Sequence, residues 1–91
     1  MSHLEECRSQ IDALDEKFAA LFEERFRIVK EIIDYKVENR LPILDEGREN
    51  EIIKKNTDRI EDEDLRRYFR AVYQYMIEVS REYQEEVLSE K

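Results

Sequence analysis

The stretch from Leu4 to Lys36 constrains the fold more than any other part of the chain, because it is one uninterrupted run of helix-forming sequence. Ser2 is expected to cap this helix, which then begins near residue 3. Such a helix is roughly 50 Å long at ~1.5 Å per residue. A compact globule of 91 residues has a radius of gyration of only ~12 to 13 Å. Part of the helix would therefore protrude bare unless a second chain covered it.

Apolar residues recur along this stretch at the a and d positions of a heptad, and we call them the heptad seam. The seam consists of Leu4, Cys7, Ile11, Leu14, Phe18, Leu21, Ile28, Ile32 and Tyr35. A second stripe on the same helix consists of Phe22, Phe26, Val29 and Ile33. The two stripes together predict that the second half of the helix packs against two neighbours, a partner copy and a later helix. Arg25 interrupts the seam at an a position, where a cation is unfavourable unless an anionic group meets it.

Two shorter helices are expected after the first one. Pro42 stops the long helix, because the residue before a proline is forced towards an extended conformation. Asp45 is expected to cap a second helix that runs to about Asn56, and residues 56–60 are expected to form a connector. Asp62 is expected to cap a third helix that ends near Leu88.

Composition agrees with a single all-helical domain over residues 1–91. The apolar fraction of 41%, at helical spacing, argues for a packed fold despite a charged fraction of 44%. The net charge of −8 argues against binding to nucleic acid or to an anionic membrane. No apolar run could span a membrane and no signal-peptide pattern opens the chain, so we expect a cytoplasmic location. The fold class that follows is all-α, with three helices, one of them very long, in an intertwined homodimer.

Three cations of the long helix are candidates for an anion site. Arg25 and Lys36 are eleven residues apart, about three turns, so they face nearly the same way. Arg8 lies ~25 Å from Arg25 and about 100° around the helix, so within one chain it cannot reach the same small ligand. If two long helices cross antiparallel near Ala19, the partner's Arg8 comes level with the segment between Arg25 and Lys36. Each site would then be built from two chains, and the dimer would hold two sites.

The other two helices add further polar candidates. Asp45, Arg48 and Glu49 share one face at the start of the second helix. Ser80 and Gln84 continue an apolar stripe of the third helix that contains Tyr73 and Ile77. The resulting cage would suit a small dianion that also carries a hydroxyl group. It contains no histidine, cysteine nucleophile, phosphate loop or metal-binding carboxylate cluster, so reactions that need those groups are not expected.

The order and spacing of these residues resemble the all-helical class of chorismate mutase. The resemblance rests on Arg8-x-x-Ile11-Asp12-x-x-Asp15, Glu24-Arg25, Lys36, Pro42-Ile43-x-Asp45-x-x-Arg48-Glu49 and Ser80-x-x-x-Gln84. It covers nearly the whole chain. It implies an intertwined three-helix homodimer that converts chorismate to prephenate for aromatic amino-acid biosynthesis in the shikimate pathway, with neither a cofactor nor a metal.

The resemblance also implies which groups bind and which act on the ether oxygen. Arg25 and the partner's Arg8 would bind the two carboxylates of chorismate, since a planar guanidinium meets a carboxylate through two hydrogen bonds. Lys36 and Gln84 would donate to the ether oxygen. Because Gln84 is a neutral donor at every pH, activity is expected to extend through neutral pH.

The remaining candidates would orient the substrate. Glu49 and the backbone amide near Asp45 would hold the ring hydroxyl. Ser80 would assist at a carboxylate. Arg48 would orient Asp45 and add positive potential to the site.

Each candidate also has an ordinary explanation when it is considered alone. Arg25 could set helix register opposite a glutamate of a partner chain. Lys36 and Arg8 could be surface cations. Asp45 could serve only as a cap, while the polar residues of the other helices could be solvated charges or a tolerated polar edge. Three functions follow: the mutase, a lyase that removes pyruvate from isochorismate on the same scaffold, and a non-catalytic helical dimerisation module.

Overall fold

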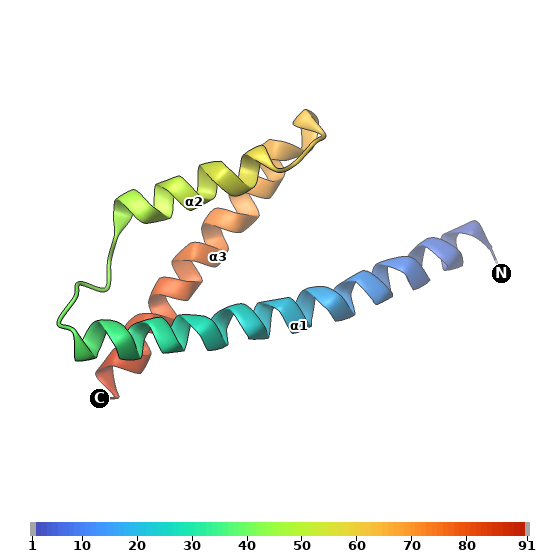
Figure 1. The fold of residues 1–91 in the computed structure, drawn as a ribbon. Helices are drawn as coiled ribbons and strands as arrows, with labels where there is room; N and C mark the ends of the chain where they lie inside the picture. The colour runs from blue at the N-terminus through green and yellow to red at the C-terminus, as the bar shows by residue number, and fades with distance from the viewer. Residues whose placement is uncertain (1, 91) are drawn as a thin grey trace.

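The computed structural model describes residues 2–90, and within this range it has three helices (Figure 1). They are α1 (His3–Glu38), α2 (Glu46–Asp58) and α3 (Glu63–Ser89). This result confirms the all-α prediction, although positions 1 and 91 of the expected domain lie outside the described range. None of the three helices has an apolar stretch long enough to span a lipid bilayer.

Each helix begins at the cap that the sequence predicts. The side-chain oxygens of Ser2, Asp45 and Asp62 each accept a hydrogen bond of 3.0 to 3.1 Å from a backbone N–H in the first turn of the following helix. A helix N-terminus leaves its first N–H groups without carbonyl partners, so a short polar side chain placed just before it is stabilising. Local sequence therefore determines where all three helices start.

The chain reverses direction between α1 and α2. The side-chain amide of Asn39 donates to the carbonyl oxygen of Tyr35 at 2.8 Å, which satisfies one of the last carbonyl groups of α1. Arg40 has a φ of 54°, in the left-handed region that turns the chain away from the helix axis. The backbone N–H of Leu41 then donates to the carbonyl oxygen of Lys36 at 2.8 Å. The helix thus ends before Pro42, as expected.

The expected connector at residues 56–60 is wrong in part, because α2 continues through Asp58. The amide of Asn56 donates to the carbonyl oxygen of Ile52 and to the hydroxyl of Tyr73 on α3, both at 2.9 Å. The hydroxyl of Thr57 also bonds a carbonyl four residues earlier, at 2.6 Å. These contacts, one of them to another helix, hold the last turn of α2 in place.

α3 is the central element, because it packs against both α1 and α2. The buried apolar core is small and consists of Val29, Ile33, Ile53, Ile77 and Val87. The second stripe of α1 is the face that meets α3, where the rings of Phe26 and Tyr83 lie 5.3 Å apart between centroids. This contact confirms that a later helix is one of the two neighbours predicted for this half of α1.

The first half of α1 extends away from the rest of the chain (Figure 1). The chain measures 56 Å along its longest axis and has a radius of gyration of 16.7 Å, well above the ~12 to 13 Å of a compact chain of this length. The seam residues Leu14 and Phe18 are more than half exposed. The predicted protrusion of the long helix is therefore present in the single chain.

Candidate active site

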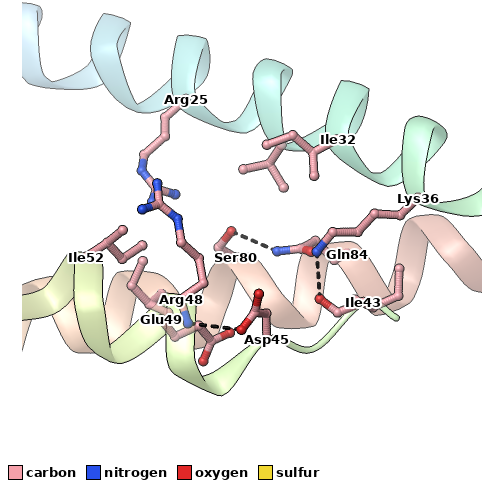
Figure 2. A pocket seen from close by; sticks show the side chains of 12 residues that line it. Arg25, Ile32, Lys36, Ile43, Asp45, Arg48, Glu49, Ile52, Ser80 and Gln84 are labelled. Atoms are coloured by element: carbon pink, nitrogen blue, oxygen red, sulfur yellow. Dashed lines mark hydrogen bonds between the residues drawn. The ribbon is translucent and has the colours of Figure 1, made fainter. Parts of the chain in front are cut away.

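Seven of the eight predicted site residues line one cavity of about 330 Å³ between the three helices (Figure 2). The polar residues of its lining are Arg25, Lys36, Asp45, Arg48, Glu49, Ser80 and Gln84. The apolar residues of its lining are Val29, Ile32, Ile43, Ile52 and Ile77. Residues that are up to 59 positions apart in the sequence are therefore brought to a single concave site.

Lys36 lies in the last turn of α1 and extends across the cavity (Figure 2). Its ammonium donates to the carbonyl oxygen of Ile43 at 3.0 Å. An ammonium has three N–H donors, so two remain for a ligand after this bond. The bond to Ile43 therefore fixes the position of the charge without consuming its capacity to bind.

Arg25 reaches into the cavity from the middle of α1 and is half-buried. Its guanidinium carbon lies 5.9 Å from the centroid of the Tyr73 ring, within range of a cation–π interaction. The Tyr73 hydroxyl in turn accepts the 2.9 Å bond from Asn56. The contacts of Tyr73 and Asn56 beside the cavity were not predicted from the sequence. A tyrosine in an apolar stripe does, however, indicate a buried hydroxyl that needs a hydrogen-bond partner.

The start of α2 presents Asp45, Arg48 and Glu49 to the cavity. The carboxylate of Asp45 accepts from the backbone N–H of Arg48, at 3.0 Å. The guanidinium of Arg48 lies 3.7 Å from the carboxylate of Glu51 and points towards the cavity in Figure 2. The backbone N–H of Arg48 thus holds the Asp45 carboxylate. The resemblance had implied that the Arg48 side chain orients Asp45.

Glu49 forms an ion pair that sequence reasoning missed. Its carboxylate lies 3.4 Å from the guanidinium of Arg81 on α3. Arg81 is not part of the cavity lining, so it contacts Glu49 from outside. The sequence carried no local signal for this pair, because Arg81 lies among Glu78, Glu82 and Glu85 of the same helix.

Ser80 and Gln84 form the α3 wall of the cavity. Ser80 is only 3% exposed, and its hydroxyl oxygen accepts from the amide of Gln84 at 3.4 Å. The Gln84 amide has a second N–H that is available to a ligand. α3 thus contributes a hydroxyl and a neutral amide to a cavity whose lining also contains Arg25, Lys36 and Arg48.

The electrostatic balance of the cavity is positive, in contrast to the chain as a whole. Arg25, Lys36 and Arg48 supply three positive charges. Of the two carboxylates, that of Asp45 caps α2 and that of Glu49 is paired with Arg81. A chain with a net charge of −8 therefore contains a local site suited to an anion.

Arg8 is the one predicted site residue that the single chain does not bring to the cavity. It is exposed and lies in the second turn of α1. The first half of this helix extends away from the other two (Figure 1). This placement agrees with the expectation that Arg8 cannot serve the site of its own chain. Among residues 2–90, no three His, Cys, Asp or Glu side chains gather where they could hold a metal ion.

Comparison with known proteins assigns the family. A family model described as chorismate mutase type II matches residues 7–85. Searches among curated proteins and among solved structures return no match. The matched range covers most of the chain and includes all eight predicted site residues. The protein therefore belongs to the chorismate mutase type II family and is an isomerase.

Proposed function

We propose that the cavity binds chorismate and rearranges it to prephenate. The observation that carries the proposal is the convergence of three cations and a neutral amide donor, from three helices, on one cavity of about 330 Å³. A volume near 300 Å³ is at the lower end of the range for small-molecule sites, which suits a compact dianion. The apolar residues of the lining would exclude water around it.

The reaction sets the tasks of the protein. Within one molecule, the carbon–oxygen bond of the ether breaks as a carbon–carbon bond forms, so no atom or proton enters or leaves. The protein must select the folded conformer in which the reacting ends meet. It must also stabilise the negative charge that develops on the ether oxygen. Neither task needs a nucleophile, and the proposal involves no cofactor.

Carboxylate binding would select the conformer. Arg25 is held against Tyr73 and can meet one carboxylate through two parallel hydrogen bonds. The partner's Arg8 would meet the other carboxylate, and Ser80 would assist. Ile32 and Ile77 also line the cavity, so they would press on the ring and side chain of the substrate.

Two donors would stabilise the ether oxygen. Lys36 is anchored by its bond to Ile43 and keeps two N–H groups for the substrate. Gln84 lies on the facing helix and donates without carrying a charge. A preorganised donor in a site closed to water is worth ~3 to 4 kcal/mol in the transition state. Since Gln84 needs no protonation, the rate should persist through neutral pH.

The ring hydroxyl would be held at the start of α2. Glu49 would accept a hydrogen bond from it, with support from the backbone amide near Asp45. Both residues line the cavity. The guanidinium of Arg48, which also faces the cavity, would add positive potential near the substrate.

The proposal includes a homodimer. The seam residues Leu4, Ile11, Leu14, Phe18 and Leu21 are each more than half exposed in the single chain, and a second copy crossing α1 antiparallel would cover them. The same crossing would bring the partner's Arg8 to the cavity. We further propose that the protein is cytoplasmic, which is the location expected from the sequence.

The test is to follow the loss of chorismate absorbance with purified protein and to identify the product. Lys36→Ala should lower kcat about 10² to 10³-fold, because it removes one preorganised donor. Lys30→Ala is the matched control, since Lys30 is an exposed lysine of the same helix that does not line the cavity. Absence of turnover, or a Lys36→Ala variant as fast as the parent, would refute the proposal.

The same preparation separates the two other functions. A lyase would release pyruvate from isochorismate and form no prephenate. A dimerisation module would gain no resistance to heat from chorismate. It would also be stabilised or unaffected by Arg25→Ala, which replaces a seam cation by an apolar residue.

A further inference from the structure

We infer that Arg81 is a positioning residue that holds the carboxylate of Glu49 in the orientation needed to bind the ring hydroxyl of the substrate. The inference rests on the proposed function and assigns it a residue that lies outside the cavity. Glu49 lines the cavity, whereas Arg81 lines a neighbouring hollow of about 200 Å³ to which Glu49 also contributes. Glu49 and Ile77 line both spaces, and Arg81 contacts the Glu49 carboxylate from the side of the neighbouring hollow.

Arg81 pairs with a glutamate of α2 although two glutamates of its own helix are within reach. Arg81 has Glu78 one turn before it and Glu85 one turn after it, both at spacings at which helical side chains meet. All three side chains line a shared hollow on the surface of α3. The Arg81 guanidinium nevertheless pairs with Glu49 of α2, at 3.4 Å. Its position therefore connects two helices at the edge of the site.

The environment of the pair favours a role in binding over a role in stability. The side chains of Arg81 and Glu49 are 36% and 21% exposed. The Nε atom of Arg81 is buried and, among the described residues, has no hydrogen-bond partner. Burying an unpaired N–H is unfavourable, and an apolar side chain of similar length would avoid this cost. A contact that is poor for stability but adjacent to a binding site is typical of functional positions.

The chemistry of the pair explains what Arg81 contributes. A carboxylate has two oxygens, and Arg81 lies against Oε1 of Glu49. The second oxygen remains free to accept from the substrate hydroxyl. The positive charge of Arg81 also offsets the repulsion between the Glu49 carboxylate and a dianionic substrate. Without Arg81, the Glu49 carboxylate would lose the partner that fixes its orientation, and its charge would repel the ligand.

The first test is Arg81→Met in the full chain, measured with chorismate. The contact with the hydroxyl exists in both the bound substrate and the transition state, so its loss should raise KM about tenfold and leave kcat nearly unchanged. The melting temperature should not fall, and Arg81→Lys should restore part of the affinity. Arg70→Met is the control, because it removes the same charge from the same helix at a position outside the cavity lining.

A double-mutant cycle then distinguishes positioning from a general effect of charge. In a Glu49→Gln background, Arg81→Met should change KM less than twofold, because the carboxylate that Arg81 holds is already absent. An equal loss in both backgrounds would mean that Arg81 acts on the substrate directly and would overturn the inference. A large fall in melting temperature without rescue by Arg81→Lys would indicate a structural role and would also overturn it.

The two proposals can fail separately. If the parent turns over chorismate, Lys36→Ala is much slower, and Arg81→Met matches the parent in KM, the inference about Arg81 is wrong while the proposed function stands. If the parent fails to turn over chorismate at all, the proposed function fails and the inference with it.

Discussion

The two apolar stripes of α1 have similar composition but different surroundings. In the second stripe, Val29 is 8% exposed and Ile33 is fully buried, because α3 packs against them. In the heptad seam, Phe18 is 65% exposed, and Ile28 and Ile32 in the packed half of the helix are still more than 40% exposed. The seam therefore lacks a neighbour along its whole length in the single chain, including the part beside the cavity.

Under the proposed function, this difference makes folding of the chain and completion of the site two separate requirements. The second stripe needs only this chain, and it brings α1 against α3 so that Arg25 and Lys36 reach the cavity. Apart from Ile32, which lines the cavity, the seam residues are exposed within one chain, and so is Arg8. Large exposed apolar surfaces commonly mark interfaces between proteins. If the seam pairs with a second copy, one surface would bury the apolar residues and supply the missing cation.

The largest expected effect is complementation between two inactive variants. Arg8→Ala and Lys36→Ala should each lose most activity as pure homodimers, because each damages both sites. After equal mixing with subunit exchange, half of the dimers are heterodimers and each has one intact site, so about a quarter of the parent activity should return. Chorismate turnover before and after mixing provides the measurement.

The control for this experiment is a mixture of Lys36→Ala with Gln84→Ala. The proposal takes Lys36 and Gln84 from the same chain, so in a heterodimer of these variants each site lacks one donor and no activity should return. If Arg8→Ala with Lys36→Ala also failed to recover, the sites would not be shared between chains. The seam would then need a different explanation.

The next effect concerns the seam itself. Phe18→Asp should place a carboxylate in an interface that excludes water, which weakens association about 100-fold or more. Analytical ultracentrifugation should then detect monomer at concentrations at which the proposal expects the parent to be a dimer. Ser9→Asp adds the same charge on the opposite face of the helix and should remain dimeric. Equal sedimentation of Phe18→Asp and the parent would argue against the seam as an interface.

Much of the fold could be predicted because the signals that define it are local. A cap such as Asp45 or Asp62 precedes each shorter helix by one residue, and its effect depends only on the first turn that follows. The end of α2 was less predictable. Asn56 is typical of a connector by composition, but its amide bonds Tyr73 on another helix, and this tertiary contact extends α2. A local pattern does not contain that information.

The candidate site divides in the same way. Arg25, Lys36 and Gln84 stand out in the sequence because each interrupts an apolar pattern, and their joint spacing predicts that they meet. Arg81 does not stand out, because charged residues surround it on α3 and its partner Glu49 lies 32 positions away. A contact of this kind becomes visible only when the packing of α2 against α3 is known.

The smallest expected effect concerns an ion pair on α2, which packs against α3 within one chain. It sharpens the comparison between the two stripes of α1, because it should not depend on a second chain. Asp58, at the end of α2, pairs with Lys54 at 2.9 Å. The hydrogen bond and the charge of Lys54 lower the pKa of Asp58 below its ordinary value of 3.8. Because the folded pKa is the lower one, folding favours the ionised form, and the resulting stability is present above pH 3.8. It is lost as the pH falls through the folded pKa.

A cycle of Lys54→Met, Asp58→Asn and the double variant isolates this pair, because it cancels the separate interaction of each charge with the end of the helix. Thermal unfolding at pH 7 should show a small positive coupling, as both side chains are more than half exposed and the pair is screened by solvent. The coupling should vanish at a pH well below 3.8. It should also be the same at high and low protein concentration, unlike the effect of Phe18→Asp. A coupling that changed with concentration would mean that this end of α2 also contributes to the dimer, so that the contrast between the two stripes of α1 would not describe the whole interface.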